Sequence, residues 1–137
     1  MSRQDAKAAK MEPGNDLDRL ARLVIGAAID VHRELGPGYQ ESIYEGALAF
    51  ELEERGIEFE RQKTFSVRYK EQPVGEGRVD FLIDGKLVVE LKAVEKLLPV
   101  HKAQVISYLK ATACQLGLLI NFNENLLRSG IQRVILT

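Results

Sequence analysis

Apolar residues recur at helical spacing in the first part of the chain and at strand spacing after it. The first run places them three or four positions apart: Leu17, Leu20, Leu23, Val24, Ala27, Ala28 and Val31. This spacing predicts a helix that runs to about Leu35, with Asn15 or Asp16 as its N-cap. The Gly-Pro-Gly of residues 36–38 ends it, because proline cannot continue a helix. A second helix is predicted over residues 40–55, with Gly56 at its C-terminal end.

The period shortens to that of strands after Gly56. Apolar and aromatic positions there fit one or two extended segments: Phe59, Phe65, Val67 and Tyr69. Residues 78–83 and 87–94 are predicted to form two further strands. Between them lies Asp84-Gly85, a dipeptide typical of tight β-hairpins.

The rest of the chain alternates a helix with short apolar strands. Pro99 suits the start of a helix that continues over residues 100–113. Strands are predicted over 116–122 and 131–136, with a turn or short helix over 123–129. The order of helix, helix, three strands, helix, strand and strand predicts an α/β or α+β domain. Its central mixed sheet would be flanked by helices.

Length and composition predict one globular domain over residues 15–137. The chain has 137 residues, of which 45% are hydrophobic and 28% charged, as in ordinary globular domains. Residues 1–14 are polar and are expected to be a disordered lead-in. They lack the apolar segment of a secretory signal, and nowhere are there the roughly 20 apolar residues of a membrane span. We therefore expect a cytoplasmic protein with no membrane partner.

Net charge and cysteine content narrow the classes of function. The formal net charge of -1 argues against tight, sequence-blind coating of DNA, because lysine and arginine neutralise phosphates in such binding. The 19 basic residues could still gather on one face. With Cys114 as its single cysteine, the chain has neither an internal disulfide nor a cysteine-ligated zinc or iron–sulfur site. Cys114 lies in an apolar stretch, so we expect a small buried hydrophobe.

The candidate chemistry is concentrated in the predicted hairpin. Asp80 lies beside one hydrophobic run, residues 81–83, while Glu90 and Lys92 interrupt the next. Because strand side chains alternate, Glu90 and Lys92 point to the same side of an otherwise apolar strand, where uncompensated charge is costly. Asp80 and Glu90 could hold a hard cation such as Mg²⁺, which prefers oxygen ligands. Lys92 would then assist an attacking water and neutralise phosphate charge.

The alternative is a surface hairpin whose polar face is simply solvated, with Glu90 and Lys92 as an exposed pair. Turn length distinguishes the two interpretations. A strict two-residue turn at Asp84-Gly85 would place Asp80 opposite Val89, so that Asp80 and Glu90 lie on opposite faces. The metal site therefore requires an odd-numbered loop or a bulge.

Three motifs in the chain resemble those of one nuclease superfamily. Asp80 followed by Glu90-Leu91-Lys92 resembles the D…ExK core of the PD-(D/E)XK nucleases, with Val79 in place of the usual proline. Gln104 and Tyr108, one helical turn apart, resemble the Q-x-x-x-Y element of RecB-like nucleases. Gly38, Glu41 and Tyr44 match the signature of the GxxExxY protein family, a branch of that superfamily.

The resemblance implies a restriction-endonuclease-like core over nearly the whole chain and a metal-dependent nuclease that acts on nucleic acid, with DNA favoured. It implies Mg²⁺ or Mn²⁺ as the cofactor, held by Asp80, Glu90, the helix-borne Glu41 and the carbonyl of Leu91. Lys92 resembles the catalytic lysine. The resemblance also gives Gln104 and Tyr108 the role of orienting the scissile strand or that lysine.

Each of these helix residues also has a structural interpretation. Glu41 could be an acid favoured by the helix N-terminus, and Gln104 with Tyr108 an ordinary half-buried face. Tyr44 is expected to be a packing residue with a tethered hydroxyl. His32 is expected to interact with the last carbonyls of its own helix, and His101 could contact phosphate.

Two rival functions stay open at this point. The fold could be a non-catalytic module that binds nucleic acid or a protein partner, or a domain that is active only within a larger assembly. A homodimer formed by pairing at an exposed sheet edge is one such assembly. Convergence of Asp80, Glu90 and Lys92 would favour the enzyme, whereas a salt bridge closing the site would favour the module.

Overall fold

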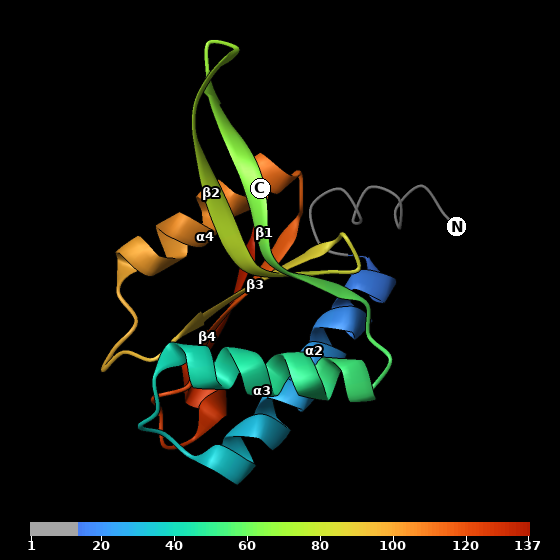
Figure 1. Cartoon of the computed structure of the whole chain (residues 1–137), viewed down its shortest axis with the longest axis vertical. Helices are drawn as coiled ribbons and strands as arrows, with labels where there is room; N and C mark the ends of the chain where they lie inside the picture. The colour runs from blue at the N-terminus through green and yellow to red at the C-terminus, as the bar shows by residue number, and fades with distance from the viewer. Residues whose placement is uncertain (1–13) are drawn as a thin grey trace.

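The computed structural model describes residues 14–137, so the predicted disordered lead-in falls almost wholly outside the described part. Its elements follow the predicted order (Figure 1). They are α2 (Asn15–Leu35), α3 (Glu41–Glu54), β1 (Phe59–Tyr69), β2 (Gln72–Ile83), β3 (Leu87–Lys92), α4 (Pro99–Thr112), β4 (Leu116–Asn121), the 3₁₀ helix η1 (Leu127–Gly130) and β5 (Ile131–Ile135).

The five strands form one mixed sheet in the order β1-β2-β3-β4-β5. Neighbouring strands are antiparallel except β3 and β4, which are parallel and are joined by the crossover through α4. A parallel pair needs such a crossover because the chain must return to the starting edge. This arrangement confirms the predicted α+β class with a mixed central sheet.

The sheet separates two apolar layers. On one face, α2 and α3 pack against the sheet through small and branched residues, among them Val24, Ala28 and Leu48. On the other face, α4 contributes Val105 and Leu109 to a second core that includes Cys114, the expected buried hydrophobe. Figure 1 shows α4 on the side of the sheet away from α2 and α3.

The β1–β2 hairpin extends well beyond the body of the molecule (Figure 1). β2 begins at Gln72 rather than at the predicted Arg78. The Pro and Gly residues of 73–77 disfavour a strand by propensity, but they pair with β1 in the hairpin. Gly77 has a packing role in this strand, since a Cβ atom there would lie 2.3 Å from the Phe65 ring. The tip turns at Lys70 and Glu71, which both have positive φ.

The loop between α2 and α3 explains part of the Gly-x-x-Glu-x-x-Tyr pattern. Gly38 has φ of 112°, a conformation that L residues rarely adopt. The buried Tyr44 hydroxyl donates to the Gly36 carbonyl over 2.6 Å and accepts from the Tyr39 N–H over 3.1 Å. Its ring stacks on Phe122 with 4.6 Å between centroids. Tyr44 is thus the expected packing residue with a tethered hydroxyl, and it fixes the entry to α3.

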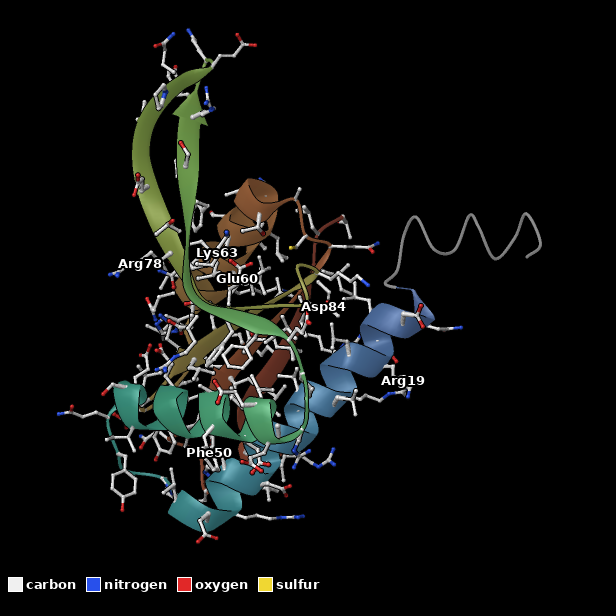
Figure 2. All side chains as sticks on the ribbon, turned by 45° about the vertical axis from the view of Figure 1, so that its right-hand side comes forward. Arg19, Phe50, Glu60, Lys63, Arg78 and Asp84 are labelled. Carbon is white, nitrogen blue, oxygen red and sulfur yellow. The ribbon has the colours of Figure 1, made fainter. Side chains whose placement is uncertain are left out.

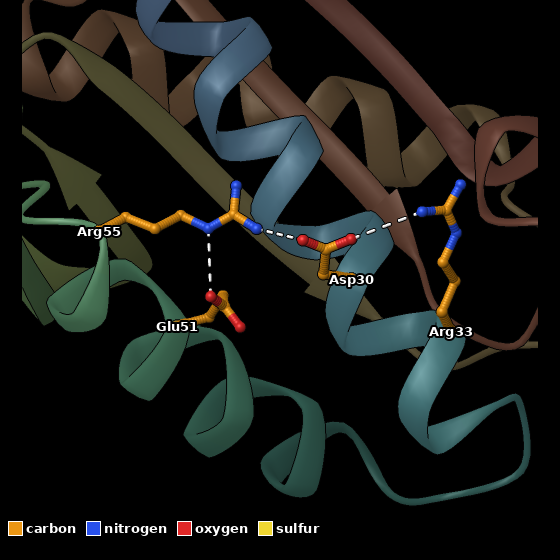
Figure 3. Close-up of polar contacts among 4 residues, drawn as sticks. All are labelled: Asp30, Arg33, Glu51 and Arg55. Atoms are coloured by element: carbon orange, nitrogen blue, oxygen red, sulfur yellow. Dashed lines mark hydrogen bonds and ion pairs between the residues drawn. The ribbon is translucent and has the colours of Figure 1, made fainter.

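Ion pairs join α2 to α3 on the surface. Arg55, just after α3, donates to Glu51 over 3.1 Å and also to Asp30 of α2 (Figure 3). Asp30 is also 3.6 Å from Arg33, so it lies between two arginines. This cluster of Asp30, Arg33, Glu51 and Arg55 is called the α2–α3 ion network below.

Several local predictions require correction. The N-cap of α2 is Gly14, without a side-chain cap, rather than Asn15 or Asp16. The Nε2–H of His32 donates to the carbonyl oxygen of Glu124 over 2.8 Å, outside its own helix. β3 ends at Lys92 rather than at residue 94. The backbone of Val94 is bound by the buried side chain of Asn121 and no longer pairs with a strand. Within residues 14–137, no helix is both long and apolar enough to cross a membrane.

Candidate active site

The β2–β3 turn has the odd-numbered length that a shared carboxylate site requires. Ile83 pairs with Leu87, which leaves Asp84, Gly85 and Lys86 in the loop. Asp84 and Gly85 have φ of 50° and 67°, a backbone that Asp and Gly tolerate best. Lys86 is the extra residue that shifts the register by one position. Continuing the pairing of Phe81 with Val89 therefore places Asp80 directly opposite Glu90.

The carboxylates of Asp80 and Glu90 each accept a backbone N–H from the neighbouring strand. The Asp80 N–H donates to Oε1 of Glu90 over 2.7 Å, and the Leu91 N–H donates to Oδ2 of Asp80 over 2.8 Å. The two side chains take the place of ladder hydrogen bonds beyond Phe81 and Val89. Glu90 is only 4% exposed. The two carboxylates are therefore fixed at one point between β2 and β3.

The sheet changes faces at this point. Phe59 packs in the α2–α3 core, whereas Phe65, six residues later, packs in the α4 core. In β2, Phe81 and Val79 are divided in the same way. A regular strand would place residues an even number apart on one face. The register is unchanged on both sides of the break, so β1 and β2 switch faces together at Gln62, whose φ is 50°, and at its opposite neighbour Asp80.

The break brings the N-terminal half of α3 to the carboxylates. Nε2 of Gln62 donates to Oε1 of Glu45 over 2.6 Å and to Oδ1 of Asp80 over 3.2 Å. Arg61 donates to the other oxygen of Glu45 over 3.0 Å. Glu41 lies one turn before Glu45 on the same face of α3. Glu41 is close enough to Asp80 for the Asp80 carboxylate to raise its pKa.

Lys92 approaches the same point from β3 and is held by α4. Its Nζ donates to Oε1 of Gln104 over 3.1 Å. Tyr108 follows Gln104 by one turn, and its phenol is near enough for Glu90 and Asp80 to affect its ionisation. Among the residues that the structure describes, Lys92 forms no ion pair with a carboxylate. The predicted site residues therefore lie together, and no salt bridge among the described residues closes the site.

The electrostatics of the site are those of crowded, buried acids. Burial, and next the carboxylate of Asp80, raises the pKa of Glu90 to about 8. Burial and Asp80 likewise raise the pKa of Glu41. Burial raises the pKa of Asp80 even though the Leu91 N–H opposes the shift. Burial, with Glu90 and Asp80, also raises the pKa of Tyr108. Burial is the largest cause in each case, and for the three carboxylates the nearby Lys92 opposes the shift without cancelling it.

A divalent cation suits this donor set. Carboxylate oxygens are the ligands that Mg²⁺ and Mn²⁺ prefer, and a bound dication would relieve the repulsion among Glu41, Asp80 and Glu90. Within residues 14–137, no three His, Cys, Asp or Glu side chains form a ready-made ligand shell. Asp80 and Glu90 instead each use an oxygen to accept a backbone N–H.

Three residues near the site are not predicted by its sequence motifs. Glu45 and Gln62 contact Asp80 directly or through one another, although Glu45 looks like a surface acid of an amphipathic helix. The fully buried Asn121 lies beside Lys92 on β4 and binds both backbone groups of Val94. It fixes the chain where it leaves β3. The spacing of Glu45 one turn after Glu41 is the only local signal for any of them.

His101 has a structural contact. Its Nδ1 accepts the Leu98 N–H over 2.9 Å at the start of α4. Leu91, whose carbonyl is predicted as a metal ligand, contacts the site through its N–H, which donates to Asp80. The Leu91 side chain is fully buried.

The mixed sheet and the acid–acid–lysine arrangement agree with the nuclease-like class that the sequence motifs predict. The sequence model described as the PD-(D/E)XK nuclease superfamily matches residues 18–134, and the chain belongs to that superfamily. The mixed five-stranded sheet with its three helices is consistent with the restriction-endonuclease-like fold. No curated protein and no solved structure matches the chain significantly. Membership of the GxxExxY family and of the RecB-like branch stays a prediction.

Proposed function

We propose that the protein is a metal-dependent nuclease that hydrolyses phosphodiester bonds in nucleic acid, with DNA as its substrate. The observation that carries the proposal is the placement of Asp80 opposite Glu90 at the face switch, with Lys92 on the same side. The odd-numbered β2–β3 turn is the condition for that placement. A solvated surface hairpin would leave Glu90 in water, whereas this residue is only 4% exposed.

Glu41, Asp80, Glu90 and the Leu91 carbonyl would hold Mg²⁺ or Mn²⁺. The chemistry such an ion supplies is a water ligand of lowered pKa and neutralisation of phosphate charge. Lys92, on the same side of the sheet, would donate to the attacking water or to a phosphate oxygen. Gln104 orients Lys92 through its side-chain oxygen, and Tyr108 would donate its hydroxyl to the scissile strand.

The alternative is a non-catalytic module that binds nucleic acid or protein on a nuclease fold. Divergence of the three residues, or a salt bridge that closes the site, would favour this module. Here the acids and the lysine are all retained, and in the described part of the chain Lys92 is held by the neutral Gln104. These two features support the enzyme.

The test is a cleavage assay on labelled single-stranded, duplex and branched DNA and on RNA, with Mg²⁺ or Mn²⁺ against EDTA. Asp80→Asn and Lys92→Ala are expected to abolish cutting. Matched controls on the same hairpin are Asp84→Asn and Lys86→Ala, an exposed pair 3.6 Å apart that should leave the rate unchanged. Failure of the folded wild-type protein to cut any substrate with either metal would favour the binding module.

A homodimer is a further part of the proposal. β1 and β5 are the two edges of the sheet, and an edge strand presents unpaired backbone groups to a second chain. Sedimentation of the full chain, with and without a duplex, tests this arrangement. A monomer under both conditions contradicts it.

A further inference from the structure

Charge is divided between the two sides of the molecule. α3 has five glutamates and no basic residue. The projecting part of β1 and β2 beyond the face switch, residues 63–79 and called the arm below, has four basic and two acidic residues. α4 has Lys102 and Lys110 and no acid. The near-neutral total of -1 therefore conceals a basic side made of the arm and α4.

Several cations on this side are not engaged by acids. Arg68, Lys70 and Arg78 of the arm, like both lysines of α4, form no ion pair within residues 14–137. Arg68 instead donates to the carbonyl of Glu71 over 3.0 Å, which leaves its positive charge uncompensated. By contrast, Arg61 and Lys63 at the base of the arm are paired with Glu45 and Glu60.

A groove of about 710 Å³ lies between the arm and α4. Its lining is mostly apolar and includes Phe65, Val67 and Tyr108. Three charged residues also line it: Arg68, Glu76 and Lys110. Exposed apolar surface beside unpaired cations matches a ligand that has both apolar faces and negative charge.

Tyr108, which lines the groove, is also close to the carboxylates of the candidate active site. The rings of Phe65 and Tyr108 meet across it, with 5.2 Å between centroids and 57° between planes. Gly77 lets Phe65 take this position, since any Cβ atom there would overlap the ring. Tyr108 lies one turn from Gln104, which binds Lys92. A chain lying in the groove would thus pass directly from the aromatic pair to the lysine.

We propose that this groove binds single-stranded nucleic acid and guides it to Lys92, with bases against the aromatic lining and phosphates near Arg68 and Lys110. The proposal rests on the proposed nuclease function and narrows its substrate. Unpaired bases offer an apolar face that aromatic side chains stack on, and basic grooves follow the backbone of single strands. A duplex hides those faces within its stack, so an apolar lining would contribute little to binding it.

Binding of a fluorescent oligothymidine by the full-length protein, followed by anisotropy in EDTA, tests the groove separately from cleavage. Arg68→Glu and Lys110→Glu should each weaken binding about tenfold, because a phosphate contact is replaced by repulsion. Glu76→Gln should strengthen binding about twofold by removing the one acid of the lining. The matched control is Arg19→Glu, an exposed charge reversal on α2 far from the arm (Figure 2), with less than a twofold effect expected.

The proposal is overturned if Arg68→Glu and Lys110→Glu weaken binding no more than Arg19→Glu does. It is also overturned if a duplex of the same length binds as tightly and responds equally to these changes. Groove-dependent binding without metal-dependent cleavage would support the groove and contradict the nuclease. Metal-dependent cleavage without groove-dependent binding would support the nuclease and contradict the groove. Circular dichroism of each variant verifies that the arm and the sheet are folded.

Discussion

The α2–α3 ion network and the candidate active site use similar residues in opposite ways. In the network, acids alternate with arginines on the surface, and the side chains of Asp30, Glu51 and Arg55 are 48%, 31% and 31% exposed (Figure 3). At the candidate site, acids gather with acids, and Glu90 is 4% exposed. The first arrangement favours the charged forms of its side chains, whereas the second disfavours the charged forms of its acids.

The pKa shifts express this difference. Hydrogen bonding to Glu51 raises the pKa of Arg55, which favours its charged form. At the candidate site, burial and neighbouring carboxylates raise the pKa values of Glu41 and Glu90, which disfavours their charged forms. Buried acids with raised pKa values, brought together at one point, make this cluster a candidate functional site. Three consequences of the contrast concern the site, and a fourth concerns the network.

The largest expected effect separates the two regions by activity. Glu90→Gln keeps the shape of the side chain but removes a predicted metal ligand, so cleavage should fall at least a hundredfold, of the order of losing one charged contact to the transition state. Glu51→Gln makes the same chemical change in the ion network and should leave the rate within about twofold. Initial rates at saturating Mg²⁺ measure both. Equal losses in the two variants would contradict the division of roles.

The second prediction concerns stability as a function of pH without metal. The pKa of Glu90 is about 8 in the folded protein and near the ordinary glutamate value of 4.5 when unfolded, so between these values the folded state binds the extra proton. Its contribution to stability is therefore greatest below about pH 4.5 and is lost as the pH rises through about 8.

Urea unfolding in EDTA measures this effect. As the pH rises from acid to mildly alkaline, the free energy of unfolding of Glu90→Gln should increase by several kcal/mol relative to that of the wild type, because the glutamine side chain cannot ionise. Added Mg²⁺ should stabilise the wild type and reduce the difference, since a ligand that binds only the folded state raises stability. Parallel pH profiles for the two proteins would show that Glu90 ionises normally.

The third prediction concerns Gln62, which we interpret as a positioning residue. It holds Asp80 and Glu45 from a backbone of φ 50°, which favours glycine. Gln62→Gly should lower cleavage about tenfold and raise the Mg²⁺ concentration needed for half-maximal rate, as loss of an outer-shell partner does. It should not lower the melting temperature, because the strained backbone is relieved.

Ala113→Gly is the matched control for Gln62→Gly. Ala113 ends α4 with a similar φ of 56° and has no contact with the carboxylates. The control should relieve the same backbone strain with no change in Mg²⁺ dependence. A fall in melting temperature for Gln62→Gly with an unchanged metal requirement would assign Gln62 a purely structural role.

The parts of the fold that local patterns encode could be predicted from the sequence. Helical spacing gives α2 and α3 to within one or two residues, and Asp84-Gly85 marks the β2–β3 turn. The shared position of Asp80 and Glu90 was only conditional, because it depends on whether Lys86 belongs to the loop or to the strand. That choice is made by the pairing of Ile83 with Leu87 and by packing on both faces.

The remaining features depend on contacts distant in sequence. Alternation predicts that Phe59 and Phe65 share a face, but the break at Gln62 separates them. Glu45 becomes part of the site only because α3 lies across this break. The residues of 73–77 form a strand because they pair with β1 in the arm, where Gly77 makes room for Phe65. No single-sequence pattern contains these tertiary contacts.

The smallest expected effect is in the ion network itself. Arg55→Ala removes the contacts to Asp30 and Glu51, both partly exposed, and should lower the free energy of unfolding by at most about 1 kcal/mol. The loss should shrink as salt is raised, because screening weakens exposed pairs. Glu90→Gln should differ from wild type at alkaline pH even in high salt, since buried charges are screened much less. Equal salt sensitivity of the two changes would mean that solvent ions screen both regions alike, and the contrast between the two regions would then disappear.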